Sequence, residues 1–322
     1  MNSEIMQDII LPIDREVIKS ELTKDRFLRH TNNLNNEIYL VNHENAPNTL
    51  KEIGRLREVT FRASGGGTGL ACDLDENDQG EFAYDQLIVW SPEDEEIIAG
   101  YRLIRCDKVL PIRNNEIHLS TAHYFNFSEK FIEEYLPQTI ELGRSFVQPK
   151  YQPSGENRKG LFSLDNLWDG LGAVVQLNPD IKYLFGKVTM YSHFNLEARD
   201  YILTFMHHYF PDKEKLVWPK HPVPLKTCTQ EFLNQLQGLS YKDGYKVLNT
   251  KVRSLGENIP PLINTYMNLS LTMKSFGTAI NGEFGEVEET GILISIPDIY
   301  EAKKDRHMNT FERDKEHGSR VK

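Results

Sequence analysis

Cysteine is scarce in this sequence, and the three that occur, Cys72, Cys106 and Cys228, stand far apart. An odd and dispersed set forms neither a disulfide framework nor the paired spacing of a zinc site. Free cysteines suit a reducing compartment, so we expect a cytoplasmic protein.

Long hydrophobic runs are also missing. The sequence has no stretch of about 18 apolar residues, and no basic N-terminal segment leads into an apolar one. We therefore expect neither a membrane-spanning helix nor a signal peptide. Any contact with a membrane is expected to be peripheral, at its inner face.

Positive charge is in short supply as well. Lysine and arginine number 37 against 47 aspartates and glutamates, which gives a net charge of −10. Proteins bind nucleic acids mainly through lysine and arginine contacts to phosphates, so this composition argues against nucleic acid as a partner. An anionic ligand would have to meet a local cluster of basic residues.

Several catalytic and metal-binding motifs are absent. No Gly-x-Ser-x-Gly elbow, Walker loop or Gly-x-Gly-x-x-Gly fingerprint follows an expected strand, which argues against serine hydrolases, nucleotide hydrolases and dinucleotide enzymes. Asp73, Asp75 and Asn77 occupy the first three ligand positions of an EF-hand calcium loop. Asp78 replaces the glycine that this loop needs and Tyr84 replaces its final glutamate, so we expect no metal site.

The residues that are present predict a mixed α/β fold. Apolar residues make up 39% of the chain and aromatic residues 10%, which is enough for a substantial core. A helix is expected to begin at Thr49, which has the capping-box spacing to Glu52. Further helices are expected at 128–135, from 165, from 195, at 229–237 and at 241–254, and strands at 37–41, 86–90, 97–104, the start of 139–160, 183–191 and 292–296.

Prolines at 211, 219, 222 and 224 mark an expected domain boundary. The sequence then divides into an N-terminal arm at 1–35, a main domain at 36–210, a C-terminal extension at 211–300 that packs on it, and a charged, frayed tail at 301–322.

The stretch 139–160 carries the first candidate chemistry, because its apolar strand contains two charges, Glu141 and Arg144. In a regular strand their side chains would point to opposite faces. A bulge at or near Gly143 would bring both charges to one face and splay the strand. A carboxylate in the resulting cleft could act as a general base toward an amine. A structural ion pair is the alternative.

Two arginines are further candidates. Arg102 interrupts an otherwise apolar strand and needs a partner if buried, for which Glu141 or an aspartate of the acidic run 73–78 would serve. The alternative is a clamp on a substrate carboxylate, which suits the bidentate guanidinium. Arg57 admits the same two interpretations and shares a helix face with Phe61.

Taken together, four motifs resemble a series shared by two related families: Arg57-x-x-x-Phe61, Asp73-x-Asp75-x-x-Asp78, Gly100-x-Arg102-Leu and Glu141-Leu-Gly-Arg144-Ser. The families are the ornithine lipid and glycine lipid type N-acyltransferases, often labelled hemolysin-like, and the acyl-homoserine-lactone synthases. The continuation at 147–155 resembles the N-acyltransferase branch. The resemblance implies the GNAT fold, a mixed twisted sheet with a splayed central strand flanked by helices, over residues 36–210.

The resemblance also implies an activity. A long fatty acyl group, with or without a 3-hydroxyl, would pass from acyl carrier protein or coenzyme A to the amine of a small amino acid, with glycine the first choice and ornithine the second. The product would begin the synthesis of an amino-acid-containing lipid. The acyl thioester is a donor substrate, and no tightly bound cofactor is implied. The implied catalytic residues are Glu141, Arg144 and Arg102, and the implied substrate-binding residues are Arg57, Phe61, Asp75, Asp78, Phe146 and Val147.

The donor is expected to meet the turn that follows the strand. Gln152-Pro-Ser-Gly155 keeps the start of the family's pyrophosphate turn, but Glu156-Asn157 replaces its second small residue. This departure favours a carrier protein over coenzyme A. The remaining basic residues of the turn, Lys150, Arg158 and Lys159, would face the acidic carrier protein or lie in a plain solvated loop.

Two other functions stay open at this stage. One is an acetyl-coenzyme A-dependent acetyltransferase of the same fold. The other is a non-enzymatic acyl-binding or membrane-active protein, as the hemolysin label suggests.

Overall fold

The computed structural model describes residues 6–110, 112, 116–153, 160 and 162–311. The chain forms two compact units. The first unit contains Met1–His118, Ile140–Ile181 and Glu301–Lys322, and the second contains Leu119–Thr139 and Lys182–Tyr300. Helices and strands alternate in both, which confirms the α/β class. The proline-rich stretch from residue 211 lies inside the second unit.

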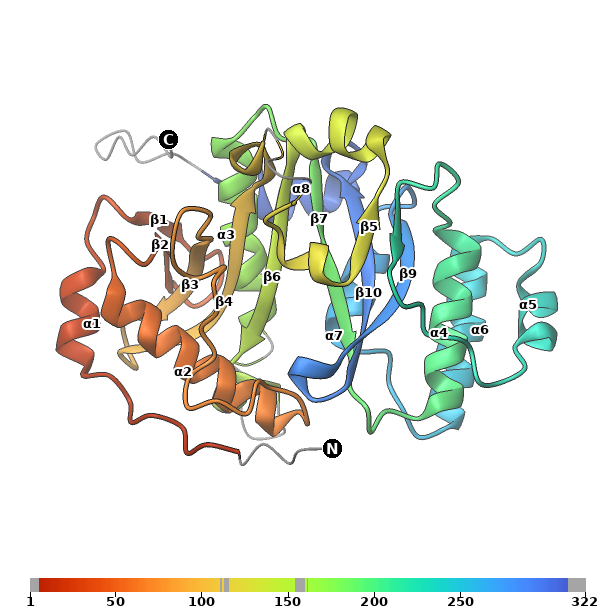
Figure 1. Cartoon of the computed structure of the whole chain (residues 1–322), viewed down its shortest axis with the longest axis horizontal. Coiled ribbons are helices and arrows are strands. Elements are labelled where there is room, and N and C mark those ends of the chain that lie inside the picture. Colours follow the sequence, from red (N-terminus) through yellow and green to blue (C-terminus); the bar gives the residue numbers. More distant parts are fainter. Residues whose placement is uncertain (1–5, 111, 113–115, 154–159, 161, 312–322) are drawn as a thin grey trace. The chain divides into compact units, whose positions relative to one another are not determined.

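The first unit is built on five strands in the order β1-β2-β3-β4-β6 (Figure 1). All neighbouring pairs are antiparallel. The strands are β1 (Phe27–His30), β2 (Glu37–Val41), β3 (Asp85–Ser91), β4 (Glu96–Arg105) and β6 (Thr139–Val147). The strands predicted at 86–90 and 97–104 are confirmed as β3 and β4, which pair as an antiparallel hairpin.

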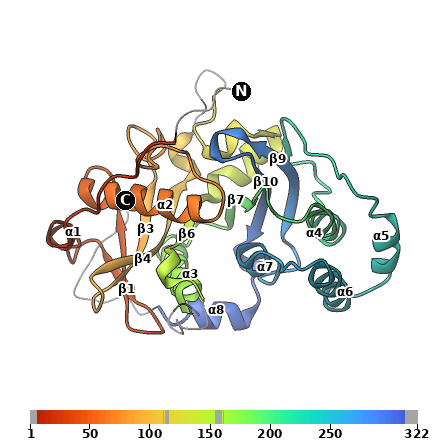
Figure 2. The same cartoon turned by 90° about the horizontal axis from the view of Figure 1, so that it is seen from below.

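Helices cover both faces of these strands. Figure 2 shows α2 (Pro47–Ala63) on one side and α3 (Ser163–Leu177) on the other, with α8 (Glu301–His307) beside α3. The short helix α1 (Arg15–Glu21) packs near α2. The apolar stripe of α2, including Leu50, Ile53 and Leu56, is buried as its spacing predicts.

The predicted start of α2 is wrong in its detail. The helix begins at Pro47, and Thr49 is not its cap. The Thr49 backbone N–H and hydroxyl both donate to Glu21, each at 2.7 Å, while Glu52 pairs with Arg55. A carboxylate from α1 thus takes the place of the local capping box, because it satisfies the free N–H groups of the first turn.

The second unit has three antiparallel strands in the order β7-β10-β9: β7 (Tyr183–Met190), β10 (Val287–Ser295) and β9 (Lys274–Asn281). A separate pair joins β5 (Phe125–Phe127) to β8 (Val217–Pro219). Phe131, Phe185 and Phe276 form an aromatic cluster in its core. Its helices are α4 (Leu196–Tyr209), α5 (Gln230–Leu236), α6 (Tyr241–Ser254) and α7 (Pro261–Met267).

The sequence patterns located the starts of α4, α5 and α6 to within one residue but did not predict α7. The side chain of Asn195 accepts hydrogen bonds from the N–H groups of Glu197 and Ala198, so α4 begins at the predicted residue. The helix expected at 128–135 is instead a π-helical turn, Phe131–Tyr135, followed by the 3-10 turn Leu136–Gln138. None of the helices in the described part of the chain is both long and apolar enough to cross a membrane.

Gly172 sets how closely α8 can approach α3. A Cβ atom at this position would collide with the backbone carbonyl of His307. We predict that Gly172→Ala destabilises the protein by about 1–3 kcal/mol, because backbone cannot move aside as a side chain can. Urea unfolding followed by circular dichroism measures this difference.

Gly170→Ala, on the same helix, is the matched control. There a Cβ would approach side-chain atoms alone, Leu87 at 2.9 Å and Ile38 at 3.1 Å. We expect a smaller loss, partly offset by the better helix propensity of alanine, about 1 kcal/mol. Equal stability of the two variants would contradict the prediction.

Candidate active site

The site is built on a row of residues that crosses the first unit's sheet. Gln86 on β3 is the register partner of Arg102 on β4, and Arg102 is the partner of Gly143 on β6. Paired residues in a sheet project their side chains to the same face. Helix α2 adds Arg57 to this face, where its guanidinium donates to the Gln86 side-chain carbonyl.

Asp78 joins these residues into one network. Its fully buried carboxylate accepts hydrogen bonds from Arg57 at 3.0 and 3.1 Å, from Gln86 at 3.0 Å and from Arg102 at 3.2 Å. It also accepts from the backbone N–H of Asp75 at 3.1 Å. Buried charges are tolerated only when they are paired in this way, so the acidic loop must lie against the sheet.

The acidic loop continues the network toward solvent. Asp75 accepts a hydrogen bond from Arg102 at 2.6 Å and lies 3.6 Å from Arg144, and Asp73 lies 3.1 Å from Arg144. The side chains of Asp75 and Arg144 are 25% and 14% exposed, whereas that of Arg102 is 2% exposed. The network therefore reaches solvent at Asp75 and Arg144.

Burial raises the pKa of the Asp75 and Asp73 carboxylates, and the charges of the neighbouring arginines lower it. Burial alone would raise the pKa of Asp75, but the charge and hydrogen bond of Arg102 outweigh it and hold that pKa below its usual range. Asp73 is almost wholly buried. Its pKa is raised by burial, which the charge of Arg144 only partly offsets.

The predicted bulge in the strand is confirmed. Gly143 pairs with Arg102 and Phe146 pairs with Gly100, so Arg144 and Ser145 together lie opposite the single residue Tyr101. Arg144 takes a positive φ of 48°, which is unfavourable for a side chain with a Cβ. Its guanidinium is held by Asp73 and Asp75, and these ion pairs stabilise the strained conformation.

Glu141 lies on the same face of β6, in register with Ile104. It is 1% exposed, and its carboxylate accepts a hydrogen bond from the hydroxyl of Tyr84. The guanidinium carbon of Arg102 lies 5.2 Å from the centre of the Tyr84 ring. We call the assembled set the charged cluster: Arg57, Asp73, Asp75, Asp78, Tyr84, Gln86, Arg102, Glu141 and Arg144.

The predicted apolar contacts lie at the edges of the charged cluster. Phe61 is buried on α2, one turn beyond Arg57. Phe146 packs so tightly on Gly100 that a Cβ atom added to Gly100 would lie 2.8 Å from the Phe146 ring. The N–H of Gln148 donates to β4 at Ile98, and N–H directions alternate along a strand, so the N–H of Val147 is directed away from β4.

Only two of the residues predicted to bind the acyl donor lie in the part of the chain that the structure describes. Lys150 pairs with Glu96 at 3.0 Å and lies over the ring of Tyr151. Gln152 donates from its side chain to the carbonyl of Val147 at 2.9 Å. The remaining predicted donor residues, Gly155, Arg158 and Lys159, lie outside the described residues.

Three members of the charged cluster were not predicted as site residues: Asp73, Tyr84 and Gln86. The buried strand around Gln86 offered a signal, since a polar residue in an apolar run needs a partner. Asp73 belonged to the recognised motif. Nothing in the local sequence marks Tyr84.

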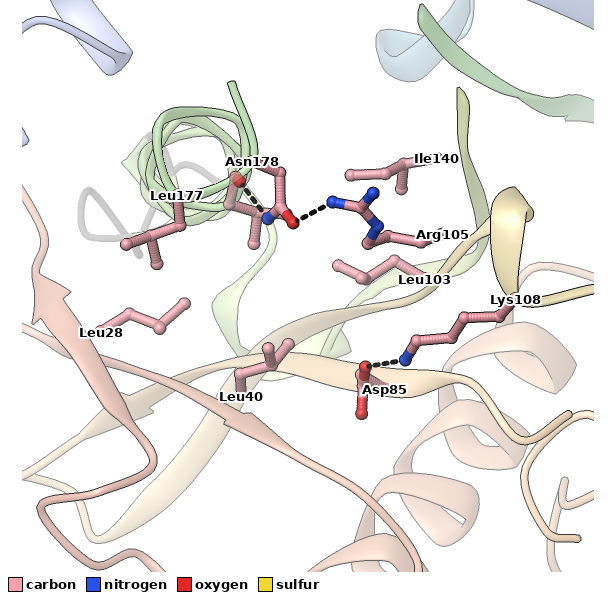
Figure 3. Close-up of a pocket in the computed structure, with 10 residues that line it drawn as sticks. Leu28, Leu40, Asp85, Leu103, Arg105, Lys108, Ile140, Leu177 and Asn178 are labelled. Atoms are coloured by element: carbon pink, nitrogen blue, oxygen red, sulfur yellow. Dashed lines mark hydrogen bonds and ion pairs between the residues drawn. The ribbon is translucent and has the colours of Figure 1, made fainter. Parts of the chain in front are cut away.

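A small hollow on the opposite face of the sheet contains none of these residues. Figure 3 shows Arg105 turned toward Asn178 and Lys108 toward Asp85, at 2.8 and 3.5 Å. The floor is apolar, and the hollow has room for roughly one water molecule. This size does not suit a fatty acyl chain or an amino acid.

The comparisons with known proteins agree with the fold. Residues 56–158 match an acetyltransferase (GNAT) domain, and this span contains the whole charged cluster. Over 306 residues the chain is 55% identical to the glycine N(alpha)-acyltransferase of Bacteroides thetaiotaomicron, covering 95% of this chain and 91% of that protein. It is 53% identical to the glycine N(alpha)-acyltransferase of Phocaeicola vulgatus, covering 95% and 94%.

The chain belongs to the glycine N(alpha)-acyltransferase family. It is therefore an N-acyltransferase enzyme, which confirms the enzymatic prediction, and the GNAT fold inferred from the four motifs is confirmed. Structures of the CoA-dependent acyl-homoserine lactone synthase BjaI, with MTA and with SAM and isopentyl-CoA, are 11% and 12% identical. They align with TM-scores of 0.38 and 0.37 over 86% of this chain and 92% of theirs.

The depressed pKa of Asp75 predicts a pH-dependent contribution to stability. Asp75→Asn should lower the free energy of unfolding at pH 7 by about 2 kcal/mol, because Arg102 loses a charged hydrogen-bond partner. The contribution of a carboxylate with a lowered pKa is complete above about pH 4 and is lost as pH falls below that value. The difference between parent and variant should therefore shrink from pH 5 toward pH 3.

Chemical denaturation across this pH range measures the effect, with Asp8→Asn at an exposed position as the control. A difference that stays constant from pH 7 to pH 3 would mean that the charge of Asp75 does not stabilise the fold.

Proposed function

We propose that this enzyme transfers a long fatty acyl group from a thioester donor to the amine of glycine. The observation that carries the proposal is the identity of more than half of the residues, over 95% of the chain, to two proteins named glycine N(alpha)-acyltransferase. The charged cluster supports it, because it presents groups of both signs to solvent.

The charges of the cluster suit a small zwitterion. Three arginines face four carboxylates, Asp73, Asp75, Asp78 and Glu141, so the fully ionised cluster carries 3 − 4 = −1. An ammonium group would balance this charge, and an arginine at the solvent side would bind a carboxylate through its planar fork. We assign acceptor binding to Arg144 and Asp75, the two most exposed of these charges.

The deeper residues support this arrangement. In our proposal Arg102 and Arg57 lock the carboxylates, Asp78 orders the loop over the acceptor, and Phe61 closes the apolar side. Their burial and mutual hydrogen bonds suit such a role, since a fixed cluster needs no reorganisation when substrate binds.

The chemical step is a direct acyl transfer. Glu141 takes a proton from the amine, directly or through one water, and the amine nitrogen attacks the thioester carbonyl. A C–N bond forms, the C–S bond breaks, and the leaving thiolate takes up the proton that the nitrogen loses as the amide forms. The backbone N–H of Val147, which is directed away from β4, polarises the carbonyl oxygen. By the same alternation the N–H of Phe146 faces β4, so Phe146 is kept as a substrate-binding residue only. No covalent enzyme intermediate is needed.

We propose acyl carrier protein as the donor. Support comes from the sequence at 152–157, where the pyrophosphate turn of coenzyme A enzymes is incomplete. A carrier protein offers a single phosphate on its pantetheine arm. The basic residues Lys150, Arg158 and Lys159, with Gln152 and Gly155, would receive it. The product would be an N-acylglycine, formed at the start of an amino-acid-containing lipid, with the enzyme at most peripheral to the membrane.

The roles of Glu141 and Arg144 are tested with purified variants. Glu141→Gln should lower kcat by about 10²-fold or more, because it removes the base. Arg144→Ala should mainly raise the KM for glycine, because it removes the group that binds the acceptor carboxylate. Product formation is followed by mass spectrometry, and circular dichroism checks folding. Glu133→Gln, in the second unit, is the control. Parent rates in folded Glu141→Gln and Arg144→Ala would refute both roles.

The identity of the acyl donor is tested by comparing three thioesters in separate assays. Long-chain acyl carrier protein, the matching acyl-coenzyme A and acetyl-coenzyme A are supplied separately with glycine, and kcat/KM is measured for each. We expect the carrier protein donor to be preferred by at least about tenfold, which corresponds to 1.4 kcal/mol of differential binding. Faster turnover of acetyl-coenzyme A would support the alternative of an acetyltransferase, which the GNAT domain match alone also allows.

A further inference from the structure

Tyr84 occupies a central place in the charged cluster that no motif explains. It is fully buried, and its backbone N–H donates to the carbonyl of Asn77 at 2.8 Å. Its own carbonyl accepts from the side chain of Gln86 at 3.3 Å. The residue is thus fixed on one side to the acidic loop and on the other to β3.

The side chain of Tyr84 contacts two residues of the proposed chemistry at once. Its hydroxyl donates to Glu141, and its ring lies 5.2 Å from the guanidinium carbon of Arg102. The hydroxyl must be the donor when the carboxylate is ionised, since an ionised carboxylate can only accept. The ring stands next to the Arg102 guanidinium, which donates to Asp75 and Asp78.

We propose that Tyr84 is a positioning residue for the acyl transfer. Its hydroxyl fixes the direction of the Glu141 carboxylate that accepts the amine proton. Its ring packs against the Arg102 guanidinium, which donates to Asp75 and Asp78. This inference rests on the proposed role of Glu141 as the base.

The test is Tyr84→Phe, which keeps the ring and removes only the hydroxyl. Without that donor the Glu141 carboxylate is no longer held in one direction, so kcat should fall by about tenfold. The KM for glycine should stay at the parent value, because the residues that bind the acceptor are unchanged. The KM for the acyl donor should not change.

Tyr39→Phe is the matched control. Tyr39 lies in the same sheet, is 7% exposed and donates from its hydroxyl to Glu37 at 2.7 Å, outside the charged cluster. Both variants lose one hydrogen bond to a carboxylate and should lose similar thermal stability. Only Tyr84→Phe should lower kcat. If both variants keep the parent's kcat, Tyr84 has no positioning role.

The Glu141→Gln variant separates this inference from the proposed function. If Glu141→Gln is inactive and Tyr84→Phe lowers kcat at an unchanged KM, both stand. If Glu141→Gln is inactive and Tyr84→Phe behaves as Tyr39→Phe, only the inference about Tyr84 is overturned. If Glu141→Gln retains the parent rate, the role of Glu141 fails and that of Tyr84 fails with it. In the double variant Tyr84→Phe should add almost nothing to the loss, because both changes act through one carboxylate.

Discussion

The buried carboxylate of Asp78 is the interaction on which the first unit's functional face depends. Arg57 on α2 and Arg102 on β4 are both withdrawn from solvent, and each would be costly to bury without a negative partner. Asp78 serves both, and it can do so only if the acidic loop folds back between helix and sheet. That position in turn brings Asp75 to Arg102 and Asp73 to Arg144. The positions of Asp73 and Asp75 therefore follow from the pairing of Asp78 with the two buried arginines.

The bulge in β6 depends on the same loop. Gly143 would be the obvious residue for an unusual backbone conformation, yet the positive φ falls on Arg144. A glycine there would have adopted this conformation at lower cost but would supply no guanidinium for Asp73 and Asp75. The strain, of order 1–3 kcal/mol, is held by ion pairs that reach from the acidic loop to the strand. The loop and the bulge therefore stabilise each other.

Local sequence patterns predicted what local physics determines. The stripe of α2, the β3–β4 hairpin and the Asn195 cap depend on neighbours a few residues apart, and the structure confirms them. The need of Arg102 for an aspartate of the 73–78 run could also be predicted, because a buried cation leaves few choices. The start of α2 could not, since Glu21 competes from a separate helix. Tyr84 was missed for the same reason, because its partner lies 57 residues away and is reached only after the sheet has formed.

In the proposed mechanism, stability and acceptor recognition share one network but depend on different residues of it. Arg57, Asp78 and Arg102 are withdrawn from solvent and already satisfy one another, so a substrate has little to gain from them directly. Asp75 and Arg144 each have one face toward this buried part and one toward solvent. An acceptor that binds there would meet charges whose directions are already fixed. Because these side chains become ordered when the protein folds, binding of the acceptor does not have to order them. A polar cluster that would be expensive as a mere structural feature is thereby suited to hold a small zwitterion in one orientation beside Glu141.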